Sequence, residues 1–148
     1  MAHKPRVIAN WFLSTAALEG EALTQMELQK LVYIAHGWHL ALLDEPLIDE
    51  VVEAWKWGPV IPSLYRSFAR FGASAIPAES MKPTLPEKTE SLLNDVWEVY
   101  KRFTAAELSA MTHKPNTPWS LAFKKEIRNI PISNDSIKLH YNEMKNRS

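Results

Sequence analysis

The chain has 148 residues, of which 46% are hydrophobic and 23% are charged, a composition typical of one folded domain with a single core. Its 17 basic and 17 acidic residues cancel, so neither nucleic acid nor a membrane is expected as a partner, and no apolar run is long enough to span a bilayer. The absence of cysteine excludes disulfides and thiolate chemistry, and the first residues lack a secretory signal, so a cytoplasmic location is expected.

The first part of the chain predicts two helices and then a short β element. A proline suited to the first turn opens a helix over residues 5–18. Thr24 and Glu27 form a capping box that starts a second helix, which ends near Leu43. The apolar face of this second helix is broad, which suits a central position in the fold. Residues 47–60 favour β-branched and aromatic side chains, which indicates a short strand or a two-stranded ribbon.

The remainder predicts further helices around one long loop. A helix opens at Pro62 and closes at Gly72, and the proline-rich residues 73–86 form a surface loop long enough to be mobile. After the loop we expect a helix over 87–103, a helix from the capping box at 104–107 and a short helix with Thr117 as N-cap. An extended segment over 129–133 and a helix from 134 complete the chain. The polar tail over 144–148 is expected to fray. The predicted fold class is therefore mainly α, a compact helical domain with a small β-ribbon, in a single domain over residues 1–148.

Histidine side chains are the candidates for catalysis or metal binding. His36 and His39 lie three positions apart on the central helix, but a structural zinc needs four ligands and none follows nearby, so hydrogen-bonded core histidines are favoured. His113 has no serine or carboxylate at a spacing that defines a catalytic pair, and an interaction with the end of its helix is favoured. We therefore expect no catalytic residue, metal or cofactor. A small histidine-dependent metal enzyme or hydrolase is the alternative from another class of function.

Aromatic residues are abundant, with six Trp, five Phe and four Tyr. A core of this size does not easily hide six indoles, each of which needs a partner for its N–H group, and Trp and Tyr dominate interface hot spots. Strand alternation in "WKWGPVIP" predicts that Trp55 and Trp57 share one face with Lys56 on the other. The two rings are expected either to pack in the core or to form a platform for a protein partner.

The candidate partner-binding residues extend beyond these two rings. The helix after the ribbon offers interface-prone side chains, and residues 124–128 form a basic patch opposite in charge to an acidic patch over residues 44–53. Each patch is interpreted as a solvated face or as a surface for a charged protein partner. The full set of candidates is Trp55, Trp57, Tyr65, Arg66 and Lys124.

Three segments in combination resemble a known family. "LQKLVYIAHGWHLAL", "PLIDEVVEAWKWGPVIPSLYRSFARFG" and "LSAMTHKPNTPW" are similar to the Panacea domain, the SocA-like antitoxin family first labelled as phage-associated proteins, and the resemblance covers residues 24–123. It implies a bacterial or prophage antitoxin that neutralises a cognate toxin by direct protein contact. An adaptor that delivers the toxin to a cytoplasmic protease, as in at least one branch, is the alternative. The resemblance implies no catalytic residues.

The segment "AWKWGPV" is the most recurrent piece of that family, whose toxins differ widely. A scaffold corner is therefore the favoured interpretation of this segment. We expect Gly58 and Pro59 to set a tight turn, with one tryptophan packed and the other partly exposed.

Overall fold

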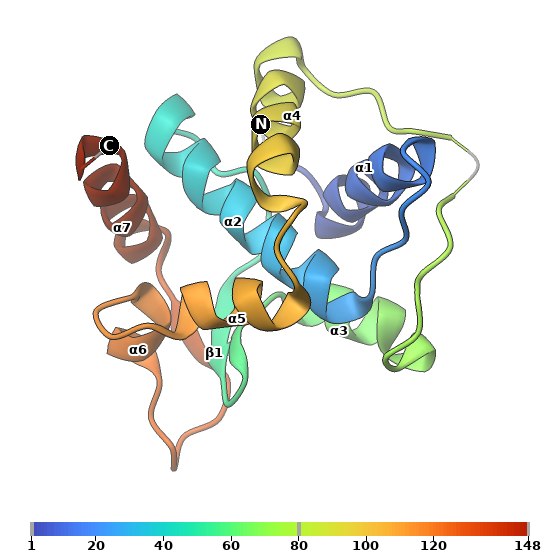
Figure 1. The fold of residues 1–148 in the computed structure, drawn as a ribbon. Coiled ribbons are helices and arrows are strands. Elements are labelled where there is room, and N and C mark those ends of the chain that lie inside the picture. The colour runs from blue at the N-terminus through green and yellow to red at the C-terminus, as the bar shows by residue number, and fades with distance from the viewer. Residues whose placement is uncertain (1, 80, 148) are drawn as a thin grey trace.

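The computed structural model describes residues 2–79 and 81–147 and is mainly helical with a small antiparallel sheet, as the sequence predicts (Figure 1). In chain order its elements are α1 (Pro5–Leu18), α2 (Gln25–Leu43), β1 (Val52–Trp55), β2 (Gly58–Val60), α3 (Pro62–Phe68), the 3₁₀ helix η1 (Ala69–Phe71), α4 (Glu87–Tyr100), α5 (Ala105–His113), α6 (Pro118–Ala122), β3 (Ile130–Ile132) and α7 (Asn134–Arg147). No helix in the described ranges has the length and apolar character needed to cross a bilayer.

Helix α2 is the axis of the fold, and α1, α4, α5 and α7 all pack against it (Figure 1). Its predicted capping box forms, because the Glu27 N–H donates to Thr24 Oγ1 at 3.4 Å and the Thr24 N–H donates to Glu27 Oε1 at 3.0 Å. Every residue over 28–37 is buried. The broad apolar face predicted for this helix therefore reflects neighbours on nearly all sides.

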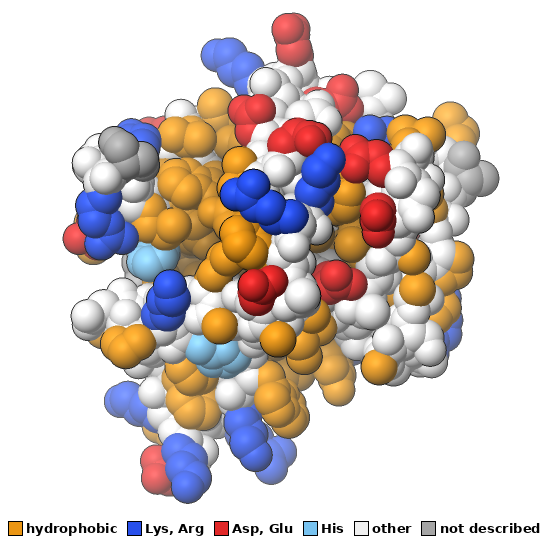
Figure 2. All heavy atoms as spheres, in the orientation of Figure 1, with side chains coloured by type: hydrophobic (Ala, Val, Ile, Leu, Met, Phe, Trp, Pro, Cys, Tyr) orange, Lys and Arg blue, Asp and Glu red, His pale blue; other side chains and the backbone are white. Residues whose placement is uncertain are grey.

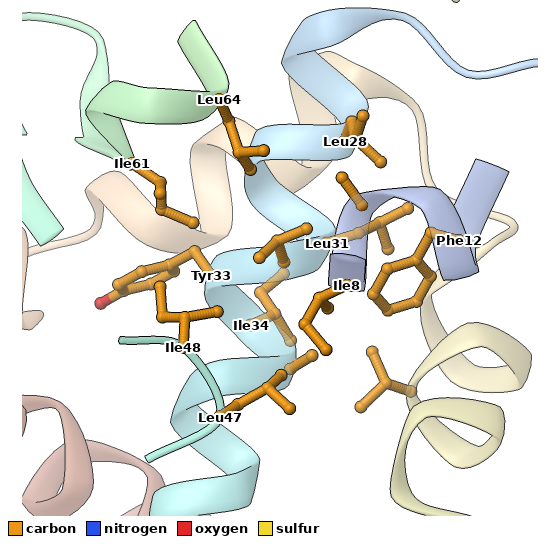
Figure 3. Close-up of a cluster of buried hydrophobic side chains, with 14 of the residues drawn as sticks. Ile8, Phe12, Leu28, Leu31, Tyr33, Ile34, Leu47, Ile48, Ile61 and Leu64 are labelled. Carbon is orange, nitrogen blue, oxygen red and sulfur yellow. The ribbon is translucent and has the colours of Figure 1, made fainter. Parts of the chain in front are cut away.

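The core is built from large apolar side chains of several elements that converge on α2 (Figure 3). Helices α1, α2 and α3 and the segments that precede β1 and α3 all contribute. Burying each such side chain fully is worth about 1.5–3 kcal/mol. The labelled members that are 2% exposed or less are Ile8, Phe12, Leu28, Leu31, Tyr33, Ile34, Leu47, Ile48, Ile61 and Leu64.

Helix α7 packs unusually closely against α2 at Gly37. A Cβ atom at this position would overlap the ring of Tyr141, which is itself 4% exposed. The Tyr141 ring also lies edge-on to Trp38, with 5.1 Å between the ring centroids. A glycine in the middle of a helix costs about 0.5–1 kcal/mol relative to alanine, and here that cost is offset by the close approach it permits.

The sheet has the strand order β2–β1–β3, with both pairs antiparallel. Trp55 pairs with Gly58, so Lys56 and Trp57 form a two-residue loop between β1 and β2. The prediction that Gly58 and Pro59 set the turn is therefore wrong, because both belong to β2. Gly58 has a φ of +118°, a conformation that an L side chain rarely adopts, which explains the glycine beside the loop.

Two helix ends differ from the prediction. Helix α4 ends at Tyr100 rather than at 103, because Thr104 starts α5 with its own capping box. Helix α7 continues to Arg147, and Met144 packs against the core, so the expectation that the tail frays is wrong over residues 144–147. Residue 148 lies outside the described residues.

The long loop over residues 73–86 contains no helix or strand in its described part but is anchored to the domain. Gly72 precedes it in a left-handed conformation, φ +56°, and follows η1 directly. Ile76 is buried and forms a bridge with Leu23, its N–H donating to the Leu23 carbonyl at 2.8 Å. The loop is therefore attached to the connection between α1 and α2 instead of extending freely.

Candidate partner-binding surface

The two histidines of α2 are structural. His36 is fully buried: its Nδ1 accepts the Leu47 N–H at 3.2 Å, and its Nε2 lies 3.0 Å from Asn134 Oδ1. Burial lowers the pKa of His36 to about 4, although the bond to Asn134 opposes the shift. His39 bridges a backbone carbonyl at 2.7 Å and the hydroxyl of Thr89 at 3.0 Å. Both are hydrogen-bonded core histidines, the interpretation that the sequence favoured.

His113 is the last residue of α5, and its Nδ1 lies 2.8 Å from the carbonyl oxygen of Ser109. The Ser109 hydroxyl is also 3.1 Å from Nδ1. Because Nδ1 carries the hydrogen donated to the carbonyl, it cannot accept the hydroxyl proton as a general base would. Partial burial and the nearby charge of Lys30 lower the pKa of His113. Among the described residues, no three His, Cys, Asp or Glu side chains are grouped to hold a metal ion.

The tip of the β1–β2 hairpin carries an exposed tryptophan. Trp57 is 60% exposed, whereas the other five are buried or half-buried. Within residues 2–79 and 81–147, Trp57 is also the tryptophan whose indole N–H has no hydrogen-bond acceptor. The other donor–acceptor pairs are Trp11 to Glu90, Trp38 to the Tyr100 hydroxyl, Trp55 to Glu53, Trp97 to Glu19 and Trp119 to the Trp55 carbonyl.

A buried lysine holds this tip from below. Lys30 is 3% exposed, and its ammonium donates to the carbonyl oxygens of Pro59 at 3.0 Å and Trp57 at 3.4 Å. Burial lowers the pKa of Lys30 to about 8. Lys30 is not among the residues predicted from the sequence. At about 100° per residue it lies on the side of α2 opposite Leu28 and Val32, where a lysine is normally interpreted as solvated, so no local pattern indicates its burial. Its neighbour Gln29 makes two hydrogen bonds to the backbone of Ile61.

A second contact holds the tip from the side. The indole N–H of Trp119 in α6 donates to the Trp55 carbonyl oxygen at 2.6 Å. The ring of Phe123 stacks on Trp119 with 4.8 Å between centroids and 15° between planes. Phe123 is the first residue after α6, so this stacking fixes the start of the loop over residues 123–129. That loop lies alongside the hairpin.

Two grooves flank the hairpin tip, and both Trp55 and Trp57 line each of them. The first groove, of about 510 Å³, lies between the tip, the start of α2 and α3, and its lining includes Met26, Lys30, Val60 and Tyr65. The second groove, of about 770 Å³, lies between the tip and the loop after α6, and its lining includes Lys56, Phe123, Lys125, Ile127 and Arg128. Figure 2 shows hydrophobic and basic side chains side by side at the lower end of the molecule, where Figure 1 places the hairpin and this loop.

The structure brings three of the five predicted partner-binding residues together. The Trp55 ring lies edge-on to Tyr65, with 5.1 Å between centroids, and Tyr65 is 43% exposed. Trp57 lies in the loop and not in the strand, so the predicted alternation does not apply to it, although both indoles line the same grooves. Arg66 is exposed on α3 and lines neither groove. Lys124 is exposed beside the second groove but is not part of its lining.

The acidic patch over residues 44–53 has partners within the chain. Asp44 pairs with Lys138, and Asp49 with Lys4 at 3.4 Å. Glu50 accepts the N–H of Ser63 at 2.9 Å, and Glu53 accepts the Trp55 indole N–H at the same distance. These carboxylates thus stabilise helix α3 and the hairpin, which agrees with a solvated face.

An exposed aromatic tip between two grooves is typical of a protein-interaction domain. Residues 28–120 match the family model described as "Antitoxin SocA-like, Panacea domain". The chain is also 31% identical over 128 residues to antitoxin SocA of Caulobacter vibrioides (strain NA1000 / CB15N), an alignment that covers 78% of this chain and 68% of that protein. No solved structure matches. The chain therefore belongs to the SocA-like Panacea family of antitoxins.

Proposed function

We propose that this protein is a non-enzymatic antitoxin that neutralises a cognate toxin by direct contact, and that the toxin docks on the hairpin tip. Membership of an antitoxin family supports the general role. The observation that carries the location is Trp57, which is 60% exposed and has no acceptor for its indole N–H among the described residues. A partner that covers this ring would remove apolar surface from water and supply the missing acceptor.

The backbone beneath Trp57 is held before any partner arrives. Lys30 anchors the carbonyl groups on the α2 side, and Trp119 anchors the carbonyl of Trp55 on the α6 side. A preorganised contact loses little conformational entropy on binding, so more of the contact energy appears as affinity. Truncating a buried interface aromatic costs on the order of 2 kcal/mol or more, about thirtyfold in affinity.

The decisive experiment compares two exposed side chains in co-expression with the product of the neighbouring gene. Trp57→Ala is expected to abolish neutralisation and to weaken binding about thirtyfold, while thermal unfolding changes little. Leu139→Ala is the matched control, because Leu139 is 62% exposed and lies on α7, away from the hairpin (Figure 1). Full neutralisation by a folded Trp57→Ala protein would refute the proposed site.

A separate experiment tests whether neutralisation leaves the toxin chemically unchanged. The toxin is separated from the complex by denaturation, refolded alone, weighed by mass spectrometry and assayed. We expect an unchanged mass and restored toxicity. A modified toxin, or one zinc per antitoxin chain in metal analysis, would instead support the histidine-dependent enzyme. A toxin half-life that shortens in cells when the antitoxin is present would identify delivery to a protease rather than direct inhibition.

A further inference from the structure

The second groove, between the hairpin tip and residues 123–129, is bordered by cations without counter-ions. We call it the basic groove. Lys56, Lys125 and Arg128 line it, and Lys124 lies beside it. In the described part of the chain, none of these four side chains forms an ion pair. The Lys56 ammonium lies 5.9 Å from the centroid of the Trp57 ring.

Elsewhere on the surface some cations have acidic neighbours. Arg6 pairs with Glu79 at 3.1 Å, and Lys101 contacts both Glu19 and Glu98. The buried ammonium of Lys30, on the other side of the hairpin, has carbonyl oxygens as its acceptors among the described residues. What distinguishes the groove is the spacing of its cations: Lys124, Lys125 and Arg128 fall within five residues of one loop, although the chain as a whole is neutral.

The floor of the basic groove is apolar. Trp55, Trp57 and Phe123 supply aromatic surface, and Ile127, which is 52% exposed, adds an aliphatic side chain. The groove thus combines a hydrophobic floor with a cationic border. A complementary ligand has an apolar side chain for the floor and negative charges on either side of it.

Resting on the proposed function, we infer that the basic groove receives an acidic segment of the toxin, whose carboxylates pair with Lys125 and Arg128 while an apolar side chain lies on the aromatic floor. The guanidinium of Arg128 suits a carboxylate because it can donate two parallel hydrogen bonds to it. The ammonium of Lys125 adds an adaptable point charge.

Protein carboxylates suit this groove better than a nucleic-acid backbone does. The cations form one short cluster instead of a stripe that could follow several phosphates, and Glu126 lies within the same loop. Glu53, bound to the Trp55 indole, adds a further negative charge near the hairpin. Nucleic acid is therefore treated as a competing outcome of the test.

The first measurement is the affinity of the purified antitoxin for the co-purified toxin at about 50 and about 300 mM NaCl. We expect the wild-type affinity to fall about tenfold over this range. The double variant Lys125→Glu/Arg128→Glu should lose at least about tenfold at the lower salt concentration and show a much weaker salt dependence. The matched control is Lys88→Glu/Arg102→Glu, which makes the same change in net charge at two exposed side chains far along the chain from the groove. The control should stay within about threefold of wild type.

The second measurement identifies the opposing charges. Each surface Asp and Glu of the toxin is changed to Lys and tested against the Lys125→Glu/Arg128→Glu antitoxin. At least one reversal should restore a large part of the lost affinity. If no reversal does so and binding is insensitive to salt, the inference is overturned, even where Trp57→Ala still weakens binding and abolishes neutralisation, so that the proposed docking site stands. The opposite pattern is a loss of affinity in Lys125→Glu/Arg128→Glu with no loss in Trp57→Ala. This result would support the basic groove as a binding site and refute the proposed role of Trp57.

The third measurement uses a labelled single-stranded oligonucleotide of about 12 nucleotides. We expect no binding near physiological salt. Binding that disappears in Lys125→Glu/Arg128→Glu, but not in Lys88→Glu/Arg102→Glu, would assign the groove to nucleic acid and overturn the inference.

Discussion

The indole N–H of Trp119 donates a 2.6 Å hydrogen bond to the carbonyl oxygen of Trp55, which joins α6 to the last residue of β1. This bond links one border of the basic groove to the hairpin that forms the other. The same indole lies edge-on to His113, with 4.5 Å between centroids, so the C-terminal end of α5 supports it. The geometry of the tip is therefore determined by residues that lie outside it.

Changing Trp119 to Phe should test this link, because it keeps a ring but removes the N–H. The loss of one hydrogen bond should lower the free energy of unfolding by about 1 kcal/mol and weaken toxin binding severalfold. Urea unfolding and a binding assay measure the two effects. Trp38→Phe is the control: it removes the bond to the Tyr100 hydroxyl at a site remote from the hairpin, so it should lower stability but leave affinity unchanged. Equal affinities for the two variants would contradict a positioning role for Trp119.

The two hairpin tryptophans should differ in what they contribute to stability. Trp57→Ala should change the free energy of unfolding by less than about 1 kcal/mol, because most of its ring is already in water. Trp55→Ala should cost roughly 2–3 kcal/mol, because Trp55 is half-buried, packs against Tyr65 and donates to Glu53. Denaturant titration of both proteins measures the difference. A comparable loss in the free energy of unfolding in both variants would show that the Trp57 ring is part of the core.

Lys30 should make stability rise between pH 7 and pH 10. Its pKa is about 8 in the folded protein and near 10.4 in an unfolded chain, so the unfolded state binds more protons in this interval. Stability therefore increases with pH, by roughly 2–3 kcal/mol from this group. His113 is the titratable neighbour whose pKa reflects the Lys30 charge, and it is mostly neutral in this range. The expected result is that wild type gains this amount relative to Lys30→Met. Parallel pH profiles for the two proteins would show that Lys30 is not the group responsible.

His36 should make the protein sensitive to acid. Its pKa is about 4 in the fold and about 6.5 when unfolded, so its contribution is complete above pH 6.5 and is lost as pH falls towards 4. Between pH 7 and pH 5 this loss amounts to about 2 kcal/mol. Urea unfolding at a series of pH values measures it. His36→Gln should be less stable at neutral pH but should show a shallower acid slope. An unchanged slope would assign the acid sensitivity to the other histidines.

Gly37→Ala should destabilise the contact between α2 and α7. The added methyl group overlaps the ring of Tyr141, and overpacking of this kind costs typically 1–3 kcal/mol or more. Thermal and urea unfolding should both show the loss. Replacing Tyr141 by Leu in the Gly37→Ala background makes room for the methyl group and should cost less than the sum of the two single changes. Simple additivity in that double-mutant cycle would contradict the proposed overlap.

Helix starts could be predicted well from the sequence because each capping signal spans only four residues. Thr24, Thr104 and Thr117 were each expected to cap a helix, and each accepts the backbone N–H three positions later. The tip of the hairpin depends instead on long-range contacts. Trp119 reaches Trp55 across 64 positions, a relationship that no local pattern encodes. The local patterns accordingly single out the aromatic side chains of the tip as candidates but not the groups that hold its backbone.

The turn itself shows a second limit of local patterns. Alternation along a strand predicts a shared face only while the strand continues, and β1 stops at Trp55. A "WKWGP" segment can turn at the glycine or before it, depending on which residues form the last pair between the two strands. Here the last pair is Trp55 with Gly58. In the observed pairing the carbonyl groups of Trp55, Trp57 and Pro59 accept hydrogen bonds from Trp119 and Lys30, which lie far from the loop in the sequence.

The hairpin loop is held through its backbone. Lys56 and Trp57 project from a backbone held by hydrogen bonds from α2 and α6 and by the pairing of Trp55 with Gly58. Mutation at these two positions is therefore expected to change the exposed side chains of the tip without moving its backbone. Under the proposed docking of the toxin at the tip, a lineage carrying this scaffold could exchange one toxin for another by single changes in the loop, each of them nearly neutral for folding.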